Sequence, residues 1–229
     1  MNKLEPGDLY KNISDNIIDL RNRVEVVCKR CNRSAAEIKV IGVTKNFPAT
    51  VIQVAYQCGL RDFGENRVQE AEIKYRDLGD IGPVVWHMVG HLQGNKVKAA
   101  LEIFDVIHSV DSIKLARVIN EHAGKIIPVF IEVNVGGEAT KYGFTVDQVQ
   151  DAVKSISTLG NLKIMGLMTV APPADNLEEV RPVFRKLKQL NASFGFNELS
   201  MGMTDDFEVA IEEGATMIRI GRAIFGERR

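Results

Sequence analysis

Hydrophobic and polar residues follow two different rhythms along this chain. Near the N-terminus the apolar residues recur every three or four positions, which predicts an amphipathic helix. These residues are Leu9, Ile13, Ile17, Leu20, Val24 and Val27. From residue 38 onward, apolar runs typical of buried strands alternate with stretches of helical pattern. The predicted strands are 38–44, 61–64, 84–90, 103–110, 126–135, 162–170, 197–200 and 216–220, and the predicted helices include 50–58, 111–123, 145–158, 176–190 and 204–213.

The alternation of strands and helices indicates a closed parallel barrel. Strand–helix repetition implies parallel pairing with right-handed crossovers, and eight such units in about 190 residues is the count of a (β/α)₈ barrel. An open doubly wound sheet is the structural alternative, but no GxGxxG motif follows a strand to support its dinucleotide-binding form. No linker or repeat divides the 229 residues, so we predict one α/β domain, 1–229, a TIM barrel with an extra N-terminal helix. Pro182 falls within the predicted helix 176–190 and is expected to kink it.

Composition and charge favour a protein that handles a small molecule. Hydrophobic residues make up 45% of the chain, and 29 basic residues face 30 acidic ones, so no basic field suggests nucleic acid or an anionic membrane. The N-terminus has no signal-peptide core, and no apolar run approaches the roughly 18 residues of a membrane span. The odd number of cysteines, 3, fits reduced thiols better than disulfides. We expect a cytoplasmic monomer without nucleic-acid or membrane partners.

The first predicted strand runs straight into a lysine, in IKVIGVTKNFP at residues 38–48. Lysine is rarely buried, because removing an ammonium group from water is costly unless the group is paired or covalently used. One interpretation is that the strand simply reaches the surface there. In a (β/α)₈ barrel, however, the chemistry sits at the carboxyl ends of the strands, which places Lys45 on the active face.

Two loops on this face carry the donors of an anion site. The candidates are Ser200, Gly202, Met203 and Thr204 after strand seven, where the N–H groups of Gly202 and Met203 are expected to be free, and Gly221 and Arg222 after strand eight. Barrels often bind phosphate between these two loops, so we predict a phosphate site there. Taken singly, Thr204 at the start of the predicted helix is explained equally well as an N-cap, and Gly221 as a turn residue.

Arg219 lies inside the eighth strand, two residues before its loop. Strand alternation places Ile218 and Ile220 on one face and Arg219 with Met217 on the other. If that second face looks into the barrel mouth, the guanidinium can meet a ring nitrogen or a carboxylate. The alternative is a structural ion pair.

Metal-like spacings occur twice without the rest of a metal site. Cys28 and Cys31 in CKRC lie on a predicted helix with no second pair. His87 and His91 in WHMVGH lack both a third ligand and a zincin's glutamate, which Met88 replaces, so packed or supporting histidines are expected. The chain also has no GxSxG motif. We predict no metal centre, and hydrolysis is unsupported.

A lysine at one strand end and a phosphate cradle across the barrel mouth suit an imine with a phosphorylated carbonyl compound. Two kinds of chemistry use a lysine and a phosphate site in this arrangement. One is class I aldolase attack on a sugar phosphate, and the other is capture of pyridoxal phosphate. The residues alone leave both open.

Seven motifs between about residue 38 and residue 226 narrow the choice. They are VIGVTKNFP, DFGENRVQE, WHMVGHLQGNK, HSVDS, IEVNVGGEATKYGF, GLMTVAP and LSMGMTDDFEVAIEEGATMIRIGRAIFG. In order and spacing they resemble the pyridoxal phosphate homeostasis protein family. The resemblance implies a barrel similar to the N-terminal domain of bacterial alanine racemase, with pyridoxal 5'-phosphate (PLP) as cofactor.

The resemblance also implies a role for each site residue. It implies an imine between PLP and Lys45, a phosphate held by Ser200, Gly202 or Thr204 on one side and by Gly221 and Arg222 on the other, Arg219 at the pyridine nitrogen, and Asn66 near the ring. Thr204 stands where the family commonly has serine, which keeps the hydroxyl.

The family is regarded as non-catalytic, which implies a role in PLP supply and transient contact with PLP-dependent enzymes. A racemase needs a second proton carrier, which in the racemases is a tyrosine from an additional β-domain. The chain stops three residues after FG, so we expect that domain to be absent, and Tyr142 is the one candidate replacement. An arginine at the pyridine nitrogen also weakens the electron sink. The alternatives are a weak PLP-dependent amino-acid racemase and, third, a class I aldolase.

Overall fold

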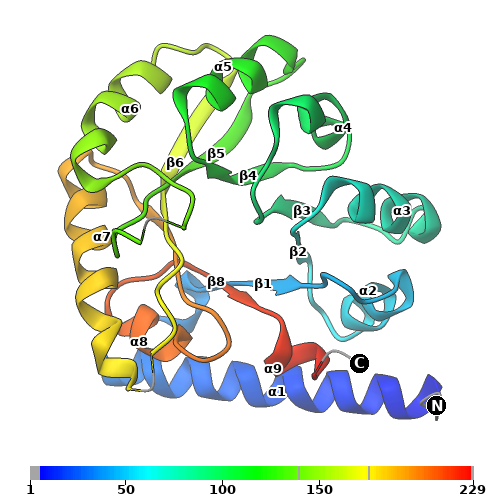
Figure 1. The fold of residues 1–229 in the computed structure, drawn as a ribbon. Helices are drawn as coiled ribbons and strands as arrows, with labels where there is room; N and C mark the ends of the chain where they lie inside the picture. The colour runs from blue at the N-terminus through cyan, green and yellow to red at the C-terminus, as the bar shows by residue number, and fades with distance from the viewer. Residues whose placement is uncertain (1–5, 139, 175, 228–229) are drawn as a thin grey trace.

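The computed structural model describes residues 6–138, 140–174 and 176–227, and their strands close into a barrel (Figure 1). Eight parallel strands pair in chain order, and β8 pairs with β1. The strands are β1 (Lys39–Val43), β2 (Asp62–Glu65), β3 (Val85–Met88), β4 (Val106–Val110), β5 (Ile127–Glu132), β6 (Leu162–Met168), β7 (Glu198–Ser200) and β8 (Met217–Ile220). The predicted (β/α)₈ barrel is confirmed.

Helices surround the barrel, and the N-terminal one packs across its side (Figure 1). They are α1 (Pro6–Arg30), α2 (Ala49–Gln57), α3 (Val68–Leu78), α4 (Val97–Leu101), α5 (Ile113–His122), α6 (Val149–Ile156), α7 (Arg181–Ser193), α8 (Phe207–Glu212) and α9 (Arg222–Phe225). The apolar stripe of α1 is buried from Ile13 to Val27, as its spacing predicts, and α1 contacts α8 and α9. An ion pair of 2.9 Å between Arg23 and Glu208 adds a polar contact to this packing.

Several predicted helices begin later than their patterns suggest, and two of these differences affect a stated expectation. The helix predicted from residue 176 begins at Arg181, so Pro182 stands in its first turn instead of its middle. No kink results, because the first turn of a helix has no use for the N–H that proline lacks. The helix predicted from residue 204 begins at Phe207, and residues 204–206 form a turn before it.

The barrel interior combines a small apolar cluster with an unusual number of polar side chains. Ile41, Phe130, Met168 and Met217 pack together inside the barrel, separate from the large core between barrel and helices. His87, His108, Ser200 and Arg219 are also buried. Barrel interiors are normally filled by branched aliphatic residues. The polar side chains therefore call for a functional explanation.

Candidate functional site

Lys45 extends the inward-facing side of β1 beyond the end of the strand. Ile41 on β1 points into the barrel, and alternation places Val43 and then Lys45 on the same side. Lys45 is half-buried, whereas Thr44 beside it is fully buried. The structure therefore places Lys45 at the barrel mouth, meaning the opening at the carboxyl ends of the strands, as predicted.

A buried ion cluster holds the backbone on both sides of Lys45. Lys74 of α3 donates hydrogen bonds of 2.7 Å to the Thr44 carbonyl, to Glu65 and to Glu70. Thr44 Oγ1 donates to Glu65 Oε1 at 2.5 Å, and the Asn46 N–H donates to Glu70 Oε1 at 2.5 Å. The turn at residues 44–46, here called the Lys45 turn, is thus fixed from outside the barrel.

The strained backbone of Asn46 belongs to the same arrangement. Asn46 has a φ of 65°, in the left-handed region that residues other than glycine rarely adopt. Asparagine tolerates this conformation better than most residues. The bond from its N–H to Glu70 stabilises the turn that directs Lys45 into the mouth.

Asn66 follows β2 and is packed against the loop after β3. A Cβ built at Gly90 would lie 2.5 Å from the Asn66 carbonyl oxygen and 2.7 Å from its Cα, so no larger residue fits there. Asn66 itself is half-buried. The close approach fixes the backbone of Asn66 at the rim of the barrel mouth, where the sequence predicts it.

The loops after β7 and β8 are joined to each other, as a shared anion site requires. Ala223 donates its N–H to Thr204 Oγ1 at 3.4 Å, and Arg222 pairs with Asp205. Gly202 has a φ of 93°, and a Cβ there would lie 2.6 Å from the Ala210 side chain. Glycine is therefore required at this tight turn.

Two details of the predicted phosphate cradle differ from expectation. The N–H of Met203 is not free, because it donates to Asp206 Oδ1 at 2.5 Å. The guanidinium of Arg222 is about half-exposed and engaged by Asp205 and, at 3.6 Å, by Glu227. The side chain of Arg222 thus links the two loops, and its contact with a phosphate stays a prediction.

Arg219 points into the barrel, as strand alternation predicts. It is 5% exposed and donates from Nη1 to Ser200 Oγ at 2.7 Å and from Nη2 to the Thr169 carbonyl at 2.8 Å. Burial lowers the pKa of Arg219 to about 10, while the carboxylates of Asp206 and Glu132 act in the opposite direction. The guanidinium remains charged at neutral pH. The predicted alternative, a direct structural ion pair, is not formed among the described residues.

Ser200 takes part in a hydrogen-bonded network that the sequence does not predict. Ser200 is fully buried. Its hydroxyl oxygen lies 2.8 Å from His108 Nδ1 and accepts the hydrogen bond from Arg219. His108 Nε2 lies 2.9 Å from His87 Nδ1, and His87 Nε2 lies 2.9 Å from Asp62 Oδ1. A direct contact between Ser200 and phosphate stays a prediction, and its burial favours a supporting role beneath the loops.

The two histidines with metal-like spacing are separated by the fold. His87 is buried inside the barrel, whereas His91 is exposed, bonded to Asp111 at 2.8 Å and stacked on Tyr142 with ring centroids 3.8 Å apart. Within the described residues, no cluster of three or more His, Cys, Asp and Glu side chains is arranged to hold a metal ion.

Glu132 adds a titratable carboxyl at the end of β5. Burial, aided by the charge of Asp111, raises the pKa of Glu132 to about 7, while Arg219 partly opposes this. Glu132 therefore changes its charge near neutral pH, unlike an ordinary surface glutamate.

Comparison with known proteins identifies the family. Residues 16–229 match the family described as alanine racemase, N-terminal domain. The pyridoxal phosphate homeostasis protein of Aquifex aeolicus is 43% identical over 227 residues, covering 95% of this chain and 99% of that protein. The chain belongs to the pyridoxal phosphate homeostasis protein family.

Solved structures agree with this family membership. PipY from Synechococcus elongatus, solved with PLP bound, is 34% identical, has a TM-score of 0.83, and is matched over 93% of this chain and 100% of its own. An alanine racemase from Clostridium difficile, 18% identical, has a TM-score of 0.72 and is matched over 95% of this chain and 57% of its own. The racemase likeness concerns the barrel fold alone.

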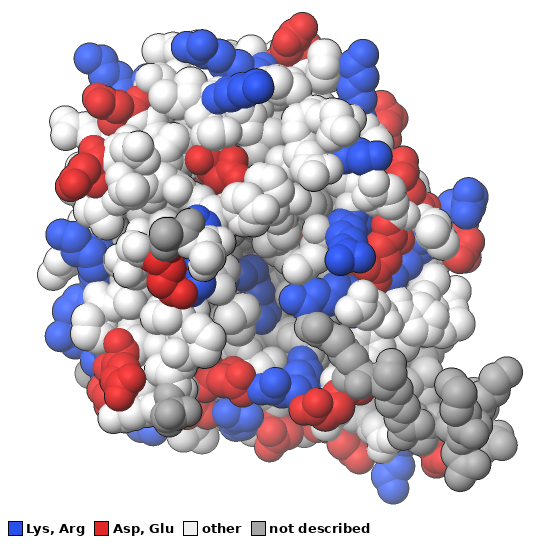
Figure 2. All heavy atoms as spheres, in the orientation of Figure 1, with Lys and Arg blue, Asp and Glu red and all other residues white. Residues whose placement is uncertain are grey.

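The charges on the surface of this family member are mixed in sign. In the view of Figure 2, Lys and Arg side chains alternate with Asp and Glu side chains, and basic atoms are visible within a central hollow. No large field of one sign covers this face, as the net charge of −1 predicts. None of the helices in the described part of the chain combines the length and apolar character that crossing a bilayer requires.

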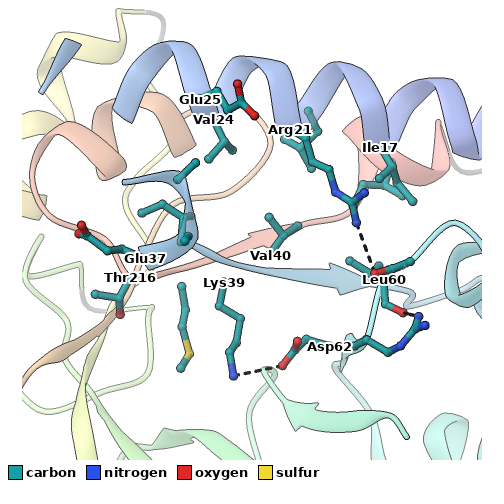
Figure 3. A pocket seen from close by; sticks show the side chains of 18 of the residues that line it. Ile17, Arg21, Val24, Glu25, Glu37, Lys39, Val40, Leu60, Asp62 and Thr216 are labelled. Atoms are coloured by element: carbon teal, nitrogen blue, oxygen red, sulfur yellow. Dashed lines mark hydrogen bonds and ion pairs between the residues drawn. The ribbon is translucent and has the colours of Figure 1, made fainter. Parts of the chain in front are cut away.

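A cavity lies at the opposite end of the barrel from Lys45. This N-terminal pocket has a volume of about 1010 Å³ and lies between α1 and the first residues of β1, β2, β7 and β8 (Figure 3). Lys39 and Asp62 form an ion pair of 3.4 Å in it. Asp62 is also the end of the buried network that leads to Arg219.

His108 and Lys74 are not among the residues that the sequence predicts for the site, whereas His87 is expected as a packed or supporting histidine. The sequence does contain a signal for His108. This polar residue lies on the same strand face as Val106 and Val110, within an apolar strand, which indicates a buried polar side chain. There is no such signal for Lys74, because on a helix pattern it looks like an exposed charge. Its partners come from the turn after β1, from β2 and from the same helix, and only the fold brings them together.

Proposed function

We propose that this protein binds PLP at the barrel mouth and takes part in intracellular PLP homeostasis, holding the cofactor as an imine on Lys45. Its family membership, together with a relative solved with PLP bound, carries the proposal. The single observation in this chain that supports it best is a lysine delivered to the mouth by a turn fixed on both sides.

The residues at the mouth fit the chemical groups of PLP. The cofactor has an aldehyde, a phosphate and a pyridine nitrogen, and it supplies a carbonyl that an amine captures reversibly. Lys45 offers the amine, and the linked loops of Thr204 and Gly221 offer donors for the phosphate. Arg219 uses one donor on Nη1 and one on Nη2 within the protein, which leaves other N–H donors, including that on Nε, for the ring.

Each residue has a separate task in this proposal. Lys45 binds the cofactor, Asn66 lies beside the ring, and Gly202, Thr204, Gly221 and Arg222 surround the phosphate. Arg219 keeps the pyridine nitrogen unprotonated, because a fixed cation disfavours a second positive charge beside it. Ser200 supports Arg219 from below.

In this proposal the protein is a cytoplasmic monomer, and its residues 1–229 form one PLP-binding domain. It supplies PLP and carries out no net catalysis. The recipients are PLP-dependent enzymes that the protein contacts transiently.

A weak amino-acid racemase is the second candidate, and the presence of Tyr142 in the loop after β5 favours it. Tyr142 is 56% exposed, however, and its ring stacks on His91. Its hydroxyl therefore lacks the enclosed, water-free surroundings expected of a catalytic base.

The decisive experiment is a visible spectrum of the purified protein before and after borohydride reduction, with the modified peptide mapped. We expect an imine band, and after reduction a stable adduct on Lys45. Lys45→Ala should lose both, whereas Lys98→Ala, which removes an exposed lysine of α4, should keep both. An adduct on another lysine, or none at all, would refute the assignment. An aldolase would show its adduct only with substrate present.

A further inference from the structure

We infer that Asp62, His87, His108 and Ser200 are positioning residues that hold Arg219 against the cofactor ring. Through their hydrogen bonds they also transmit the electrostatic effect of the Asp62 carboxylate to Arg219. The inference rests on the proposed PLP function. Together with Arg219, these residues are called the polar chain below. It runs from the N-terminal pocket to the barrel mouth.

The polar chain is continuous. Its four links are 2.9 Å from Asp62 to His87, 2.9 Å from His87 to His108, 2.8 Å from His108 to Ser200, and 2.7 Å from Arg219 to Ser200. All four lengths are those of ordinary hydrogen bonds. The links join β2, β3, β4, β7 and β8, so the polar chain crosses the barrel interior from one side to the other.

The chemistry of the two ends fixes the direction of every proton. An ionised carboxylate only accepts, so His87 donates from Nε2 to Asp62, and its Nδ1 must accept from His108 Nε2. His108 Nδ1 then accepts the proton of the Ser200 hydroxyl. The Ser200 oxygen receives the donation from Arg219, which has donors only. All donors thus point from Arg219 towards Asp62.

The charges around the polar chain agree with this direction. Burial lowers the pKa of His87, against the raising effect of Asp62, and burial lowers the pKa of His108 well below its usual value. Both rings are therefore neutral at neutral pH. The pKa of Asp62 is lowered: burial alone would raise it, but the bond from His87 and the charge of Lys39 prevail. Arg219 adds a further positive charge beside His108.

Neighbouring residues hold the rings of the polar chain in place and connect one end to solvent. Phe130 stacks on His108 with ring centroids 4.5 Å apart, and His87 and His108 are both fully buried. Asp62 lines the N-terminal pocket, where it meets Lys39 (Figure 3). A ligand or charge change in that pocket therefore acts on the end of a network whose other end is Arg219.

Nitrogen-15 NMR of histidine side chains tests the proton arrangement without any cofactor. We expect both His87 and His108 to be neutral at neutral pH, with the proton on Nε2. His87→Gln and His108→Gln assign the signals. A proton on Nδ1 of His108 would make it a donor to Ser200, break the direction of the polar chain and overturn the inference.

The cofactor provides the second readout. Ser200→Ala removes the acceptor of Arg219, and we expect about tenfold weaker PLP binding and an altered visible band. Ser109→Ala is the matched control, because Ser109 is equally buried and its hydroxyl has no partner among the described residues. Ser200→Thr keeps a hydroxyl and should restore the band.

Asp62→Asn separates charge from structure, since asparagine still accepts the bond from His87. Loss of the negative charge should disfavour the protonated imine, so the pH midpoint of the visible band should move to lower pH. If Ser200→Ala and Asp62→Asn both match the wild-type spectrum and affinity, the polar chain is only structural and the inference is wrong. If the wild type itself binds no PLP, the proposed function fails instead, and the NMR result still decides whether the polar chain exists.

Discussion

Replacing Lys74 tests how firmly the Lys45 turn is held. The Lys74 side chain is 5% exposed and donates three bonds of 2.7 Å, to Glu65, Glu70 and the Thr44 carbonyl. Lys74→Met keeps most of the apolar stem but removes all three donors. It also leaves the fully buried Glu65 carboxylate without its cation. We predict a folded but clearly destabilised protein.

The magnitude follows from the uncompensated charge. Removing one partner of a buried ion pair costs about 3–5 kcal/mol. In a domain of this size each kcal/mol lowers Tm by roughly 2–4 °C, so we expect a fall of at least about 6 °C. Burial raises the pKa of Glu65 even with Lys74 opposing it, so without Lys74 the folded protein holds this proton more tightly. The unfolded chain releases the proton first as pH rises, and the deficit should therefore grow from about pH 5 to pH 8.

The assay is thermal and urea unfolding of the cofactor-free protein at about pH 5 and at about pH 8. Glu65→Gln combined with Lys74→Met removes the buried charge, so the double variant should be more stable than Lys74→Met alone at pH 8. Lys98→Met on the exposed side of α4 is the control for losing a lysine. The reasoning is refuted if Lys74→Met costs less than about 1 kcal/mol, or if the double variant is no more stable than the single one.

Three further predictions concern the loops and the barrel mouth. Thr204→Ala combined with Arg222→Ala should weaken PLP binding about a hundredfold and pyridoxal binding far less; equal losses in titrations of both ligands would refute the phosphate assignment. The pKa of Glu132 is raised from 4.5 to about 7, so its contribution to stability is present below pH 4.5 and lost as pH rises to 7. Glu132→Gln should therefore stabilise the cofactor-free protein at pH 8 in urea unfolding, and unchanged stability would contradict this. L-Alanine incubated with loaded protein in deuterated water should give no accumulating D-isomer by chiral chromatography; D-isomer lost in both Lys45→Ala and Tyr142→Phe would establish the racemase instead.

The sequence predicts those features that depend on local patterns. Alternating apolar runs mark each strand, and the two-residue period correctly gives the inward direction of Arg219. The same logic places Lys45 at the barrel mouth, since a residue just past a strand of a parallel barrel lies at its carboxyl end. These predictions need only the neighbouring residues and the rule for the fold.

Other features depend on contacts between distant parts of the chain, and the sequence does not reveal them. His108 and Ser200 are 92 positions apart and meet only because the barrel closes. The late start of α8 follows from Asp206, whose carboxylate accepts the Met203 N–H and stabilises a turn where the pattern suggests helix. The phosphate roles of Ser200 and Arg222 remain predictions, because each side chain already has protein partners in the structure.

The distribution of these partners agrees with the proposed reversible binding of PLP. The groups that we propose to lie closest to the reacting atoms, the Lys45 turn and Arg219, are held by buried bonds to other protein groups. Binding therefore costs little rearrangement there. The loops after β7 and β8, which form the proposed phosphate site, are instead joined by the bond from Ala223 to Thr204 and by the Arg222–Asp205 pair, whose side chains are 49% and 71% exposed. Exposed pairs contribute about 0–1 kcal/mol, so we expect the opening of these loops to be the less costly route of PLP release.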